Sequence, residues 1–128
     1  MEALRSLRDQ MDNAGISMEI AMGESVRSYH AHVDYAEHGV DHLQPARLYC
    51  LAEIIRVRDY AHQHNCRIST GGFPFINATL GALYSENELL EFHQPLNEVL
   101  IPYFKVVSQI KDGDSTSRYS RHSCSARF

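Results

Sequence analysis

Apolar residues in the first half of the chain recur at helical spacing. The longest pattern is separated by four and three positions in alternation, and it comprises Met22, Val26, Tyr29, Val33, Ala36, Val40 and Leu43. This heptad spacing places side chains along one stripe of an α-helix, as in a coiled coil. We therefore expect one long helix over 18–43, which ends before Pro45 because the residue ahead of a proline disfavours the helical conformation.

Other segments carry related patterns. A short amphipathic helix is expected over 2–13. A third helix is expected over 45–64, with Pro45 in its first turn and apolar residues around a wide arc. A short helix is expected over 76–84, and a last one begins at the capping box Ser85–Glu88 and extends to residue 111, bent or divided at Pro95.

Residues 65–75 interrupt the helical pattern. They are expected to form a structured loop, with a small hairpin that begins at Arg67–Thr70 as the alternative. The sequence thus predicts an all-α fold, a small bundle of four to five helices over 1–112. The Ser/Arg-rich tail, 113–128, is expected to be disordered.

Composition limits the function classes. The chain has 128 residues, which fits one domain, and it contains no apolar run of the roughly 18 residues that span a bilayer. Residues 1–114 hold nine Lys/Arg against sixteen Asp/Glu, so this acidic part repels nucleic acid. Three widely spaced cysteines suggest neither a disulfide framework nor a metal knuckle, and they favour a reducing cytoplasm.

Histidines cluster in residues 29–42. On a helix over this range, one polar stripe opposite the apolar one would hold His30, Asp34, His38 and His42. His38 and His42 have the i,i+4 spacing at which two imidazoles can bind one metal ion. Sites in helical bundles face inward, however, so a solvated helix face is the favoured interpretation and a metal site the alternative.

No sequence motif specifies a catalytic reaction or a cofactor, and a non-enzymatic function is therefore expected. Cys50 is expected to be an inert core thiol, and Cys66, beside Arg67, to be the more exposed one. The long apolar stripes predict a homodimer that binds and sequesters another protein, such as a transcription factor. Six residues of the predicted helices are candidates for this interface: Tyr29, Val33, Leu51, Ile55, Tyr103 and Phe104.

Overall fold

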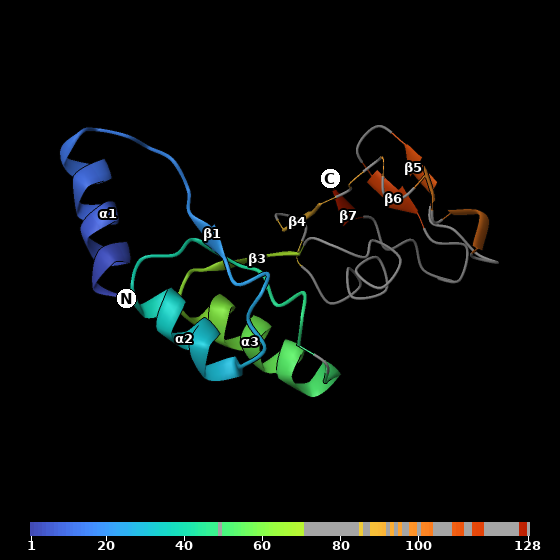
Figure 1. Ribbon diagram of the computed structural model, residues 1–128, viewed down its shortest axis with the longest axis horizontal. Helices are drawn as coiled ribbons and strands as arrows, with labels where there is room; N and C mark the ends of the chain where they lie inside the picture. Colours follow the sequence, from blue (N-terminus) through green and yellow to red (C-terminus); the bar gives the residue numbers. More distant parts are fainter. Residues whose placement is uncertain are drawn as a thin grey trace. The chain divides into compact units, whose positions relative to one another are not determined.

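The protein divides into two compact units, Met1–Ile68 and Ser69–Phe128, which are described separately. The computed structural model (Figure 1) describes residues 1–48, 50–70, 85, 88–91, 93, 95, 98–99, 101–103, 109–111, 114–116 and 126–127. In this part of the chain, no helix is long and apolar enough to cross a membrane.

The first unit alternates helices and strands. Their order is α1 (Glu2–Asn13), β1 (Ala21–Met22), α2 (Tyr29–Glu37), β2 (His42–Leu43), α3 (Leu51–Gln63) and β3 (Arg67–Thr70). The pairs β1–β2 and β2–β3 are both parallel. Parallel neighbours need a crossover connection, which α2 and α3 provide.

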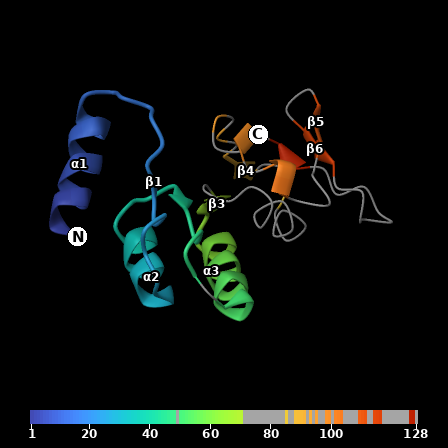
Figure 2. The ribbon, with the colours of Figure 1, turned by 45° about the vertical axis from the view of Figure 1, so that its right-hand side comes forward.

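Both crossover helices lie on the same side of the strands, where they pack against each other (Figures 1 and 2). Right-handed crossovers between strands that follow in the order β1-β2-β3 give this arrangement. Leu43 and Ile68 are register neighbours on β2 and β3, and both are fully buried. Val57 and Ala61 of α3 are also fully buried, so the core of this unit involves the strands and α3.

The second unit contains a mixed sheet. The last residues of β3, Ser69 and Thr70, pair in parallel with β4 (Leu89–Leu90), and β4 pairs in parallel with β7 (Ala126–Arg127). Two antiparallel pairs join β7 to β6 (Asp114–Thr116) and β6 to β5 (Gln109–Lys111). A 3-10 helix, η2, covers Ile101–Tyr103.

The predicted all-α bundle is therefore wrong, because the fold mixes helices with a parallel sheet. The predicted helix over 18–43 is replaced by β1, α2 and β2. Two glycines interrupt it: Gly23 has φ 116° and Gly39 has φ 91°, values that side chains disfavour. Gly39 follows the end of α2, where a residue of positive φ commonly terminates a helix.

The capping box at Ser85 forms one of its contacts without the helix that it predicts. The Ser85 backbone N–H donates to Glu88 Oε2 at 2.6 Å, yet the chain continues into β4. The part of the predicted last helix ahead of Pro95, 86–93, is thus wrong, and its end at 109–111 is the strand β5, whereas Pro95, Glu98 and Val99 between them are helical. The strand that the hairpin alternative places at Arg67–Thr70 is present as β3, but its partners β2 and β4 are parallel, and residues 71–75 lie outside the described residues. The helix expected over 76–84 lies outside the described residues.

Candidate functional site

The segment that enters β1 exposes large apolar side chains. From residue 16 to residue 22 large apolar residues occupy alternate positions: Ile16, Met18, Ile20 and Met22. In Figure 1 the segment connects α1 to β1, and none of its residues is helical. Ile16 is 48% exposed and Met18 is 62% exposed. Alternating apolar residues of this kind are typical of a strand that packs one face against a partner.

The outer edge of β1 has no neighbouring strand among the described residues. The carbonyls of Ile20 and Met22 face β2, since they accept from the backbone N–H groups of His42 at 3.0 Å and Gln44 at 2.9 Å. Because peptide groups alternate along a strand, those of Ala21 point to the other side. Ala21 is exposed. Its N–H and C=O are therefore placed to pair with an added strand.

The edge segment contains one charged residue, Glu19, and this residue is bound to the sheet. His42 Nε2 donates to Glu19 Oε2 at 2.8 Å, and Arg67 Nη2 donates to Glu19 Oε1. Both carboxylate oxygens are thus engaged, although the side chain is 57% exposed. Natural sheets commonly protect an edge strand with a projecting charge. Here the charge of Glu19 is bound by His42 on β2 and Arg67 on β3.

Arg8 fastens α1 to the beginning of the strands. Its Nη2 donates to the Gly39 carbonyl at 2.8 Å and also to Asp41 Oδ2, while its Nε donates to the Gly39 carbonyl at 3.2 Å. The same Asp41 oxygen accepts the Ile20 backbone N–H at 2.8 Å. One guanidinium therefore positions the helix, the edge segment and the start of β2 together.

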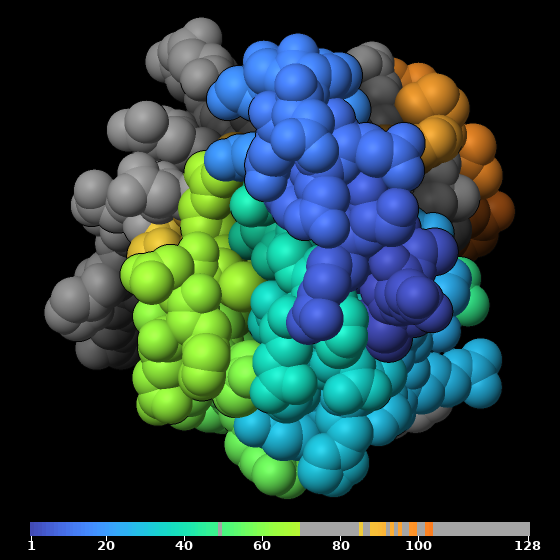
Figure 3. All heavy atoms as spheres, turned by 90° about the vertical axis from the view of Figure 1, so that its left-hand side faces the viewer, coloured from blue at the N-terminus to red at the C-terminus, as the bar shows by residue number. Residues whose placement is uncertain are grey.

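An open groove lies between α1 and the edge segment. Its volume is about 510 Å³, and it is lined by Arg8, Asp12, Gly15, Ile16, Ser17, Met18, Glu19 and Asp41. Figure 3 shows the surface that α1 and the following segment form, in blue, beside residues of α2 and β2. Three carboxylates and one guanidinium give the groove an acidic character. Apolar and acidic side chains thus meet in this groove, at the segment that enters β1.

A second polar feature lies at the opposite, carboxyl-terminal end of β1. His32 on α2 is fully buried, and its Nδ1 donates to the Ser28 carbonyl at 2.9 Å. Its Nε2 has no hydrogen-bond partner among the described residues. A Cβ on Gly23 would lie 2.9 Å from this nitrogen and 3.3 Å from the Gln44 backbone nitrogen. An uncompensated acceptor is therefore buried beside the ends of β1 and β2.

The two described cysteines have the opposite exposure to the one expected for each. Cys50 is exposed, whereas Cys66 is buried and its thiol donates to the Val40 carbonyl at 3.3 Å. Burial, and then the charge of Asp41, raise the pKa of the Cys66 thiol above its usual range. Cys66 is therefore protonated at neutral pH, so the structure gives no support to an activated nucleophile at this position.

The predicted interface residues differ in their exposure. Tyr29 is partly buried, with its ring edge-on to Tyr60 at 6.3 Å between centroids and under the Arg56 guanidinium at 4.2 Å. Val33 and Ile55 are also partly buried. Exposed positions are found at Leu51, which is 54% exposed, and at Tyr103 in the second unit, which is 83% exposed. Phe104 lies outside the described residues.

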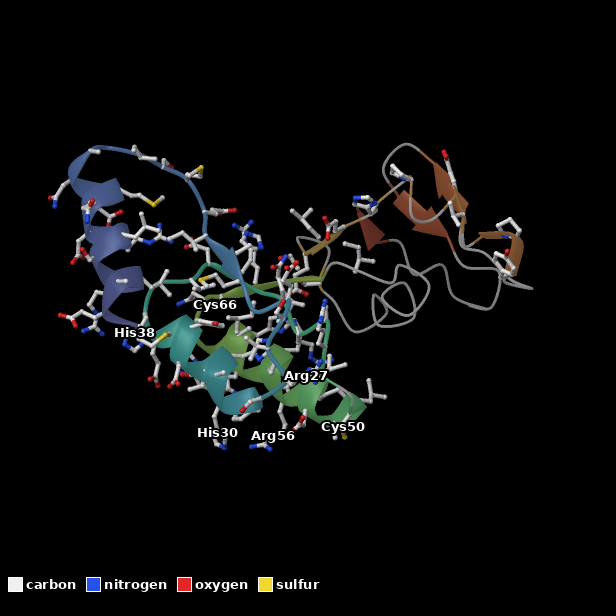
Figure 4. All side chains as sticks on the ribbon, viewed as in Figure 1. Arg27, His30, His38, Cys50, Arg56 and Cys66 are labelled. Carbon is white, nitrogen blue, oxygen red and sulfur yellow. The ribbon has the colours of Figure 1, made fainter. Side chains whose placement is uncertain are left out.

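The structure does not bring the four predicted metal ligands together. His30 and Asp34 lie on α2, and His38 caps its end with Nδ1 donating to the Asp34 carbonyl at 2.7 Å. His42 belongs to β2, where it is buried against Glu19. Figure 4 shows His30 and His38 at separate places along α2. Within the described residues, no group of three or more His, Cys, Asp or Glu side chains could hold a metal ion.

The sequence contained a signal for the edge that the heptad interpretation passed over. Ile16, Met18, Ile20 and Met22 alternate with period two, which favours a strand over a helix. By contrast, the bonds of Arg8 to Asp41 and of Glu19 to Arg67 join residues far apart in the chain. No local sequence pattern predicts such long-range pairs.

Comparison with known proteins gives no match, whether with family models, curated proteins or solved structures. The function of the chain therefore has to be inferred from its own contacts, exposures and charges.

Proposed function

We propose that the protein binds another protein by adding a strand of that partner to the free edge of β1. The observation that carries this proposal is the exposed, alternating apolar segment that leads into an edge strand whose outer peptide groups have no strand beside them in the described structure. Strand addition uses backbone hydrogen bonds for affinity and alternate side chains for specificity.

Three features of the edge support this mode of binding. Ala21 offers backbone hydrogen bonds, and Ile16 and Met18 offer apolar area that a partner would remove from water. Glu19 is the charge that would ordinarily discourage edge pairing, and it is engaged by His42 and Arg67. A partner strand would therefore contact apolar side chains, and Glu19 would not oppose it as a free charge.

The proposed role remains non-enzymatic and regulatory, as the sequence suggested, but its surface moves from helical stripes to a strand edge. A transcription factor or other target whose strand occupies this edge would be sequestered by the chain. The homodimer expected from the apolar stripes stays a prediction. The free thiols of Cys50 and Cys66, the cysteines among the described residues, support the further proposal of a reducing, cytoplasmic location.

A capture experiment tests the proposal. The tagged chain would recover its partner from the native host, and two variants would weaken recovery: Met18→Lys, which places a charge on the edge, and Ala21→Pro, which removes its outward N–H. Leu51→Lys is the matched control, since Leu51 is 54% exposed on α3 and Met18 62% exposed. Equal recovery by all variants, with circular dichroism showing that each is folded, would reject strand addition.

A further inference from the structure

We propose that the strand added to β1 is a basic segment of a partner protein, with apolar residues at alternate positions. This inference rests on the proposed function and names the chemistry of the partner. The groove between α1 and the segment that enters β1 supplies the evidence. Its lining includes the acids Asp12, Glu19 and Asp41 against one base, Arg8, and it also includes the exposed apolar residues Ile16 and Met18.

Asp12 is the least compensated charge of the groove. Arg8 is paired with Asp41, and both oxygens of Glu19 are engaged. Asp12 is exposed, and its carboxylate has no hydrogen bond or ion pair within the described part of the chain. It lies in the last turn of α1, where the helix macrodipole disfavours a negative charge. A lysine or arginine in the groove would relieve this local repulsion.

Charge also distinguishes this partner from a second copy of the chain. Two copies joined through their β1 edges would bring two such grooves together, each with the uncompensated carboxylate of Asp12. Like charges brought close across an interface oppose association. Side chains alternate between the two faces of a strand, so a segment that alternates apolar and basic residues can meet both the exposed apolar side chains and the acids.

Two synthetic peptides provide the test, one alternating valine with lysine and the other valine with glutamate. Isothermal titration calorimetry with the whole chain, at low salt, should show the lysine peptide binding about tenfold more tightly, and added salt should reduce the difference. Asp12→Asn should reduce the preference several-fold. The matched control is Asp9→Asn, which removes another exposed acid of α1 that does not line the groove.

The outcomes separate this inference from the function on which it rests. Equal affinities for the two peptides, both lost in Ala21→Pro, would overturn the basic partner and leave strand addition standing. The basic partner is also overturned if Asp12→Asn and Asp9→Asn behave alike, or if the chain alone dimerises through an edge that Ala21→Pro disrupts. Binding of neither peptide, or binding that Ala21→Pro does not alter, would overturn strand addition itself.

Discussion

Gly23 and His32 pack so closely that no side chain fits between them. A Cβ on Gly23 would lie 2.9 Å from Nε2 and 3.0 Å from Cδ2 of His32, and the Gly23 backbone has φ 116°. The imidazole is fully buried and held by its bond to the Ser28 carbonyl, so it has little freedom to withdraw. This contact joins the end of β1 to the crossover helix α2.

Gly23→Ala should destabilise the protein by about 2–4 kcal/mol, because it combines a disfavoured backbone conformation with overpacking. Urea denaturation measures the change. The control is Gly15→Ala, since Gly15 has φ 68° and a Cβ added there would meet nothing within 4 Å, and it should lose about 1 kcal/mol. Equal losses would show that His32 does not constrain Gly23.

The bonds of Arg8 should hold α1 against the strands. Arg8→Ala removes donors to the Gly39 carbonyl and to Asp41, so the free energy of unfolding should fall by about 1–3 kcal/mol. Arg5→Ala is the control, because Arg5 is an exposed arginine on the same helix, and its loss should stay within about 0.5 kcal/mol.

A double-mutant cycle then isolates the Arg8–Asp41 pair. With Arg8→Ala and Asp41→Asn, the coupling energy should be about 1 kcal/mol, since the two side chains are 22% and 36% exposed and water screens the pair in part. A coupling energy of zero would mean that Arg8 anchors the helix through the Gly39 and Met18 carbonyls and not through Asp41.

Alkaline pH should weaken the fold through Cys66. Its pKa is raised in the folded state above its ordinary value of 9.0, so above that pH the unfolded chain releases a proton that the folded chain retains. The free energy of unfolding should therefore be unaffected below this pH and fall above it, by at most about 1.4 kcal/mol per pH unit for one group. Urea denaturation at a series of pH values measures this slope.

Two variants identify the group that causes this pH dependence. Cys66→Ala should flatten the pH dependence that begins near pH 9, whatever its effect on stability at neutral pH. Tyr60→Phe should act only at higher pH, because burial, followed by the charge and hydrogen bond of Glu37, raises the pKa of Tyr60 from its ordinary value of 10.0. If the profiles of the parent and Cys66→Ala run parallel, the thiol is not the group responsible.

The sequence predicted α1 closely but misread the parallel strands. The range expected for the first helix, 2–13, agrees with its observed bounds, and α3 begins six residues after the expected start of the third helix. β2 is only two residues long, too short to show a period of two. Parallel strands buried on both faces also lack alternation, and their apolar residues extended the helical spacing of Tyr29, Val33 and Ala36.

The candidate site was less predictable than the helices. The alternation from Ile16 to Met22 could have revealed the strand edge, but its exposure depends on strand order, which local spacing does not determine. The four predicted metal ligands shared a stripe only on a continuous helix. Because α2 ends at Glu37, His42 lies on β2 and forms a hydrogen bond with Glu19 instead.

Hydrogen exchange at the Ala21 amide tests strand addition most directly. Nuclear magnetic resonance would follow this amide in the free chain and in the presence of the captured partner or the lysine peptide. Strand addition predicts fast exchange in the free chain, where this N–H points away from β2, and slowing of at least about tenfold in the complex. A bound complex in which Ala21 exchanges as fast as in the free chain would contradict it.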